Sequence, residues 1–122
     1  MSLRLSILAA GLALGISGSA WAGANQDFSL SNKTGYVLDK VFVSPTNEED
    51  WGDDVLGRDT LDDGDTVDIH FDRDATSCKW DLKVSYMDYN ESVYWRGIDL
   101  CSVSKITIYW DKNTDKTRAV TE

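Results

Sequence analysis

The chain has 122 residues, with 12 Lys and Arg against 21 Asp and Glu, which gives a formal net charge of −9 at pH 7. This acidic balance argues against binding to nucleic acid or to anionic membranes, because phosphate contacts need Lys and Arg. The 42% hydrophobic and 11% aromatic content predicts a folded domain and argues against a disordered chain.

The first 22 residues have the pattern of an export signal. Arg4 is the one charged residue there, residues 5–16 are almost wholly apolar, and Ala20 and Ala22 form the small-x-small pattern that signal peptidase reads. We therefore expect a signal peptide over 1–22 and a single domain over 23–122, in the periplasm or outside the cell. Cleavage of this signal peptide would remove Arg4, so the 12 basic residues become 11 against the same 21 acids. The mature domain would then have a net charge of −10. No later apolar run approaches the roughly 20 residues that span a bilayer.

Two cysteines, Cys78 and Cys101, are expected to form a disulfide bond in such an oxidising compartment. The bond would close a loop of about 24 residues and stabilise the fold by roughly 3 kcal/mol. A metal–thiolate site would need more ligands than the single histidine, His70, supplies. Cys78 shares the face of its strand with core residues, which predicts a buried bridge.

Apolar residues recur with a period of two along most of the domain, as expected for strands with one buried face. The alternating segments, in chain order, are 28–30, 36–44, 66–72, 78–86, 93–95 and 106–110, and residues 98–101 either continue the segment 93–95 or begin another strand. Turns are expected at 32–35, 88–91 and 111–115, the last leading into a short tail, and 48–56 is compatible with one helical turn. Six or seven short strands at this spacing predict a small antiparallel β-sandwich with one disulfide, or alternatively a small barrel.

The alternation also predicts which side chains face the core. In the segment 66–72, Val67, Ile69 and Phe71 are expected to point inward. In the segment 78–86, the polar positions, among them Asp81, are expected to face solvent.

The segment 47–74 is exceptionally acidic, with 12 Asp and Glu against two Arg. Acids this dense repel one another unless they are well solvated or a cation joins them. The segment is not an EF-hand loop: with Gly64 at the invariant glycine, Leu61 and His70 stand where carboxylates are needed. A calcium site formed by this loop is one interpretation. The alternative is that residues 62–65 form an acidic turn and the other acids form a solvated face. The candidate ligands of the calcium site are Asp53, Asp54, Asp59, Asp62, Asp63 and Asp65.

Apolar residues interrupt this acidic segment at 51–57. We expect Val55 and Leu56 to pack back onto the sandwich. Trp51 either covers an edge of the core or forms part of a contact surface.

The sequence contains the short motifs NKTGY at 32–36, VFVSP at 41–45, WGDDVLGRD at 51–59, LDDG at 61–64, CKWDL at 78–82 and DLC at 99–101. Taken together, these motifs resemble those of a group of small exported bacterial β-rich proteins of unassigned function. Some members of this group bear the name argininosuccinate lyase. The sequence gives that activity no support, because the lyase superfamily is large and helical and uses a Gly-Ser-Ser loop that is missing here.

The residues that enzymes use for nucleophilic or metal-assisted catalysis are scarce. The sequence has one histidine and no Gly-x-Ser-x-Gly motif, and both cysteines are expected to be oxidised. We therefore expect a non-enzymatic domain with no catalytic residues. Its function would be to bind a cationic partner, such as a basic protein, a basic peptide or divalent cations, through segment 47–74. The partner-binding residues would be Trp51, Asp59, Asp62, Asp63 and Asp65. A calcium-stabilised domain is the first alternative, and a small carboxylate-based hydrolase or lyase is the second.

Overall fold

The computed structural model describes residues 24–122 apart from residue 49, and in these residues the chain forms seven β-strands and no helix. The predicted signal peptide, with Ala20 and Ala22, lies outside the described residues. The strands are β2 (Phe28–Lys33), β3 (Leu38–Pro45), β4 (Thr66–Ile69), β5 (Lys79–Tyr86), β6 (Glu91–Asp99), β7 (Lys105–Asp111) and β8 (Lys116–Thr121).

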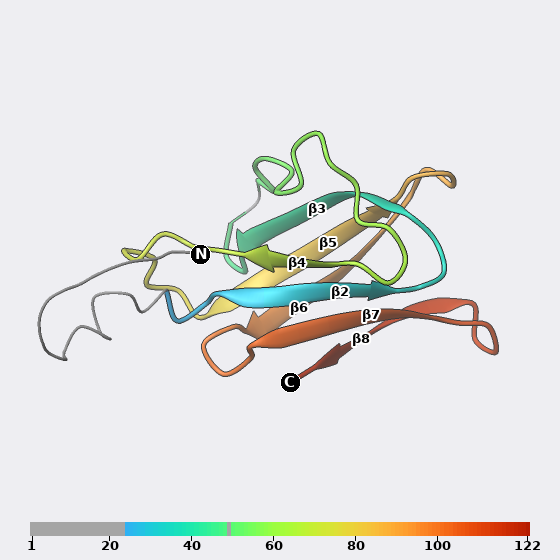
Figure 1. The fold of residues 1–122 in the computed structure, drawn as a ribbon. Coiled ribbons are helices and arrows are strands. Elements are labelled where there is room, and N and C mark those ends of the chain that lie inside the picture. The colour runs from blue at the N-terminus through green and yellow to red at the C-terminus, as the bar shows by residue number, and fades with distance from the viewer. Residues whose placement is uncertain (1–23, 49) are drawn as a thin grey trace, which may run out of the picture.

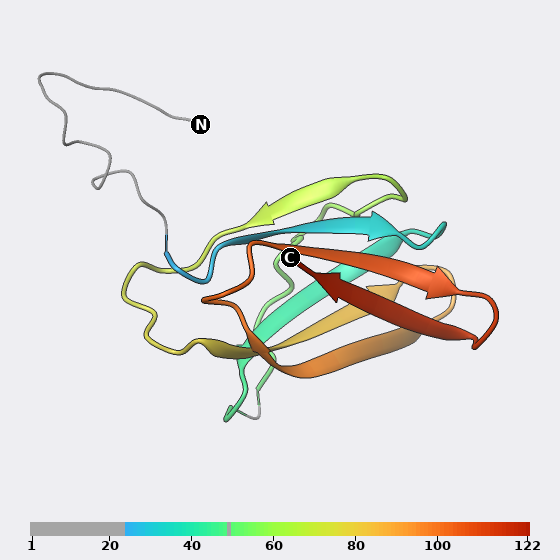
Figure 2. The ribbon, with the colours of Figure 1, turned by 90° about the horizontal axis from the view of Figure 1, so that it is seen from below.

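The strands form two sheets that face each other as a sandwich (Figures 1 and 2). One sheet has the order β4-β2-β7-β8 and the other the order β3-β5-β6. Neighbouring strands are antiparallel except β2 and β7, which run parallel. The predicted β-sandwich is therefore confirmed. The described residues contain no helix that is long and apolar enough to cross a membrane.

The core lies between the sheets and follows the predicted alternation. In β4 and just beyond it, Ile69 is buried and Val67 and Phe71 are partly buried against the core. The buried centre combines residues from both sheets and from the loops. Its members are Phe28, Leu30, Leu38, Val41, Leu56, Leu61, Ile69, Leu82, Val84, Tyr86, Leu100, Ile106 and Ile108.

Two local expectations were wrong. The C-terminal tail is strand β8, which pairs with β7 from Ile106↔Thr121 to Asp111↔Lys116. The turn between β7 and β8 is stabilised by a hydrogen bond from the Asn113 amide to the Asp111 carboxylate, which suits close pairing of these two strands. In the segment 48–56, the described residues form turns and irregular structure instead of a helical turn.

Asp81 is buried at 1% exposure, although the alternation predicted that it would face solvent. The register between β5 and β6 shifts beside it, between Trp80 and Leu82. Its carboxylate accepts hydrogen bonds from the Thr46 hydroxyl, the Gly97 amide and the Arg96 guanidinium, each at 2.9 Å. These three donors compensate for burial of the charge.

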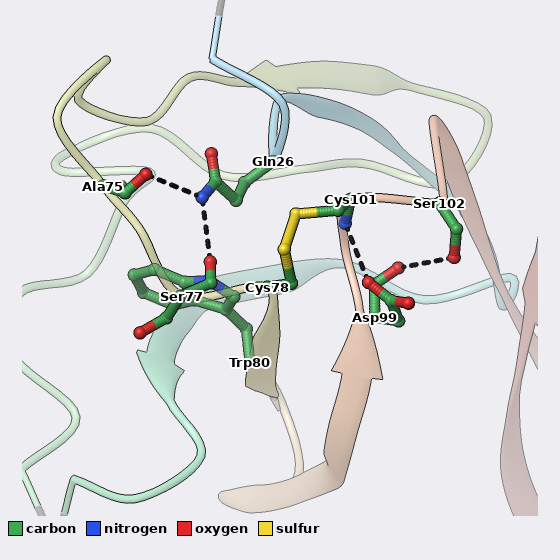
Figure 3. The surroundings of a disulfide bond; sticks show 8 residues. All are labelled: Gln26, Ala75, Ser77, Cys78, Trp80, Asp99, Cys101 and Ser102. Atoms are coloured by element: carbon green, nitrogen blue, oxygen red, sulfur yellow. Dashed lines mark hydrogen bonds between the residues drawn. A yellow bond between two sulfur atoms is a disulfide. The ribbon is translucent and has the colours of Figure 1, made fainter.

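The disulfide bond between Cys78 and Cys101 is confirmed, with a Cα–Cα distance of 5.2 Å (Figure 3). It is not buried in the core as expected, since neither cysteine belongs to the buried class. Cys78 precedes the first residue of β5 and Cys101 follows the end of β6, so the bridge joins two strand ends. The Leu100 amide donates to the Cys78 carbonyl at 2.8 Å alongside it.

Candidate functional site

The loop between β3 and β4 contains the first half of the acidic segment, and it covers the free edge of β3 (Figure 1). Leu38 and Leu61 exchange two backbone hydrogen bonds of 3.0 and 2.8 Å. Farther along β3, the Val41 carbonyl accepts a bond of 2.8 Å from the Val55 amide. An uncovered strand edge can pair with another chain, so this loop also protects the sheet.

Three of the six predicted calcium ligands bond to groups of the protein itself. The Asp54 carboxylate accepts hydrogen bonds from the Val41 amide at 2.8 Å and the Leu56 amide at 3.0 Å. Asp63 accepts one from the Gly35 amide at 2.9 Å, and Asp62 accepts one from the Thr60 hydroxyl at 3.1 Å. These carboxylates therefore have structural partners already.

The other three predicted ligands, Asp53, Asp59 and Asp65, are exposed, and their side chains have no hydrogen bond or ion pair to a described residue. Asp59 and Asp65 line a hollow of about 440 Å³. Val55 also lines it and is 43% exposed, so it does not pack onto the sandwich as expected. Leu56 does, at 8% exposure.

No three of the six predicted ligands converge on one point among the residues that the structure describes. The one group of three metal-ligating side chains found there is Cys78, Asp99 and Cys101, with candidate atoms within 4.8 Å of one another. The two sulfurs of that group form the disulfide bond. The acidic loop therefore spreads its carboxylates along the surface and does not gather them as calcium coordination requires.

Trp51 lies on the outer face of the β3-β5-β6 sheet, apart from the hollow of Asp59 and Asp65. Its ring centroid is 6.4 Å from that of Tyr94 and 5.7 Å from the Lys83 Nζ atom. It lines another hollow of about 420 Å³, together with Glu48, Asp50 and Arg96 among others. The predicted partner-binding residues therefore belong to two surfaces.

In the described part of the chain, ion pairs do not neutralise the carboxylates of the acidic segment. Between described residues the ion pairs are His70–Asp27 at 3.3 Å and Arg96–Asp81 at 2.9 Å. Neither pair includes a carboxylate from segment 47–74. Of the 11 acids of this segment that the structure describes, all but Asp54 are exposed.

A second candidate site, an aromatic pocket of about 180 Å³, was missed by the sequence analysis. It is lined by Tyr36, Tyr86, Tyr89, Glu91 and Trp110. These residues come from three separate stretches of the chain, at 36, 86–91 and 110, and each one alone is an ordinary strand or turn residue. Only the packing of the two sheets brings them together, so the sequence carries no signal for the pocket.

The pKa of Tyr86 is raised by its surroundings in this pocket. Burial is the main cause, and it raises the pKa of Tyr86 above 10.0. The hydrogen bond to Thr117 opposes this effect, whereas Tyr36 and the Glu91 carboxylate add to it. The pocket therefore favours the neutral phenol.

Comparison of the chain with protein-family models, with curated proteins and with solved structures gives no match.

Proposed function

We propose that the protein is an exported, non-enzymatic β-domain that binds a cationic protein or peptide through its acidic segment. The observation that carries this proposal is the hollow lined by Asp59 and Asp65, whose carboxylates have no partner among the described residues. The exposed side chain of Val55 lies at the same hollow. A basic side chain could place its charged end near the carboxylates and its methylene groups against Val55.

Electrostatics supports a cationic occupant. The acidic segment is held by backbone hydrogen bonds to β3, so its charges are fixed along the surface although they repel one another. A basic partner would relieve that repulsion and be attracted over a Debye length of about 10 Å at 0.1 M salt. Such complementarity governs association rate and specificity, so binding should weaken as salt rises.

The test is calorimetric titration of the folded domain with an oligolysine peptide at low and at moderate salt. The variant Asp59→Asn/Asp65→Asn should weaken binding about fivefold, at roughly 0.5 kcal/mol for each solvent-exposed charge pair. The control Asp88→Asn/Asp115→Asn removes the same number of negative charges, but from exposed acids that lie outside the acidic segment. It should change the affinity less than twofold.

Equal weakening by the two double variants would overturn the proposal, because it would mean that only net charge matters. Affinity that does not depend on salt would overturn the electrostatic mechanism. No specific contact in the described residues favours the calcium-stabilised domain or the carboxylate-based hydrolase or lyase over this proposal.

A further inference from the structure

The aromatic pocket lies at one end of the sandwich, between the ends of the two sheets. Tyr86 is the last residue of β5, Glu91 is the first residue of β6, and Trp110 lies near the end of β7. Tyr36 comes from the β2–β3 connection and Tyr89 from the β5–β6 hairpin. Figures 1 and 2 show that this connection and this hairpin lie at the same end of the molecule as the β7–β8 hairpin.

The rings are arranged around Tyr36 in edge-to-face contacts. The Tyr36 centroid is 6.0 Å from Tyr86, 5.4 Å from Tyr89 and 6.4 Å from Trp110, with interplanar angles of 86°, 90° and 87°. Nearly perpendicular rings around one cavity present a mixture of faces and edges to an occupant. Tyr36 and Tyr89 are 37% and 57% exposed, so the pocket is accessible from solvent.

Hydrogen bonds hold this arrangement in place before any ligand binds. The carbonyl of Tyr36 accepts a bond of 2.7 Å from the side-chain amide of Asn32, which is fully buried. The Tyr36 amide donates to the Thr34 hydroxyl at 3.1 Å. On the opposite wall, the hydroxyl groups of Tyr86 and Thr117 are 2.7 Å apart and join the two sheets. A pocket that is already formed avoids part of the entropic cost of binding.

The chemistry of the lining favours an organic cation. Aromatic faces carry the negative part of the ring quadrupole and attract ammonium groups within about 6 Å of the centroid. Glu91 adds a carboxylate, and none of the lining residues is Lys or Arg. A hard metal ion would require several oxygen ligands, which this lining does not offer. The volume is below the roughly 300–1,000 Å³ of drug-sized ligand sites, so it suits a single headgroup.

We propose that this pocket binds an alkylammonium group, with the aromatic rings around its methyl groups and Glu91 beside its charge. The group could belong to a free small molecule or to a methylated lysine side chain of a protein. The site shares no residue with the hollow of Asp59 and Asp65, so it does not depend on the function proposed above.

The experiment is calorimetric titration of the folded domain with choline and with its neutral carbon analogue, in which a tert-butyl group replaces the trimethylammonium group. Choline should bind at least about fivefold more tightly, because only its headgroup is charged. Glu91→Gln should weaken choline binding and leave binding of the neutral analogue unchanged. Choline affinity equal to or lower than that of the analogue, or no saturable choline binding, would overturn the proposal.

A matched pair of tyrosine variants locates the site. Tyr89 and Tyr94 are 57% and 54% exposed, but only Tyr89 lines the pocket. Tyr89→Ala should weaken choline binding about fivefold, and Tyr94→Ala should leave it unchanged. Equal effects of the two variants would overturn the assignment.

Two further titrations separate the source of the ligand and the two proposals. A short peptide with trimethyllysine that binds more tightly than free choline assigns a protein source, whereas the reverse order assigns a free small molecule; both support the pocket. Asp59→Asn/Asp65→Asn should leave choline binding unchanged. A loss of choline binding in that variant would contradict the independence of the two sites.

Discussion

Asp54 offers a quantitative test of how the acidic segment is held. Its carboxylate accepts the amides of Val41 at 2.8 Å and Leu56 at 3.0 Å, and both of these residues are buried. Asp54→Ala would remove a charged acceptor and leave both amides without it. Hydrogen bonds to charged groups contribute about 1.5–3 kcal/mol each, so we expect a loss of about 3 kcal/mol, at the lower end because Asp54 is half-buried. For a domain of this size the melting temperature should fall on the order of 15 °C.

The assay is urea unfolding of the disulfide-bonded domain, with the free energy of unfolding taken from the midpoint and the slope. Asp53→Ala is the control, because Asp53 is exposed and has no partner among the described residues, and it should change stability by less than about 0.5 kcal/mol. Asp54→Asn retains the acceptor oxygen and should fall between the two alanine variants. If Asp54→Ala costs no more than Asp53→Ala, the carboxylate does not anchor the loop to β3.

Four further outcomes follow from other parts of the structure. Asp81→Ala removes a buried carboxylate and leaves its three hydrogen-bond donors without their acceptor. It should lower the free energy of unfolding by about 3 kcal/mol in the same assay. Replacing Cys78 and Cys101 by Ala should also cost about 3 kcal/mol, and alkylation of the native protein without reductant should add no mass. Burial raises the pKa of Tyr86 above 10.0 in the folded state, so the stability that the neutral phenol contributes is present below pH 10.0 and lost as pH rises through the raised folded pKa. In an absorbance titration, Tyr86→Phe should remove a tyrosine that ionises above pH 10.0. Calcium and magnesium at equal ionic strength should give equal, small shifts of the melting temperature. A specific calcium site would instead add about 2.7 kcal/mol to the free energy of unfolding when the calcium concentration is 100 times its Kd.

The strands and the core could be predicted because burial on one face leaves a period of two in the sequence. That signal failed where backbone geometry, instead of burial, decides the outcome. Asp81 occupies a polar position in the alternation, but the shift in register beside it encloses its carboxylate under Thr46 and Arg96. The disulfide was predictable from the cysteine count together with the expected export, whereas its place at the strand ends depends on where β5 begins and β6 stops.

The sites were harder to predict because their geometry depends on sheet packing. The acidic segment was visible in the sequence as composition, but composition does not show which carboxylates bond to the protein. Tyr36 and Trp110 are 74 positions apart in the chain and meet because β2 and β7 are neighbours in one sheet, with Lys33 paired to Tyr109. The parallel pairing of β2 with β7, on which that meeting depends, leaves no trace in local alternation.

The acids of this protein therefore divide by what their carboxylates contact, and this division decides which variants are informative. Asp54, Asp63 and Asp81 accept backbone amides, so neutralising them would weaken the fold and lower binding indirectly. Asp59 and Asp65 bond to no described side chain or amide through their carboxylates, so neutralising them should relieve repulsion and leave stability unchanged or slightly higher. If Asp59 and Asp65 bind a partner, neutralising them should lower the binding affinity and leave the stability of the fold unchanged or higher. If their role is purely structural, neutralising them should lower the stability instead.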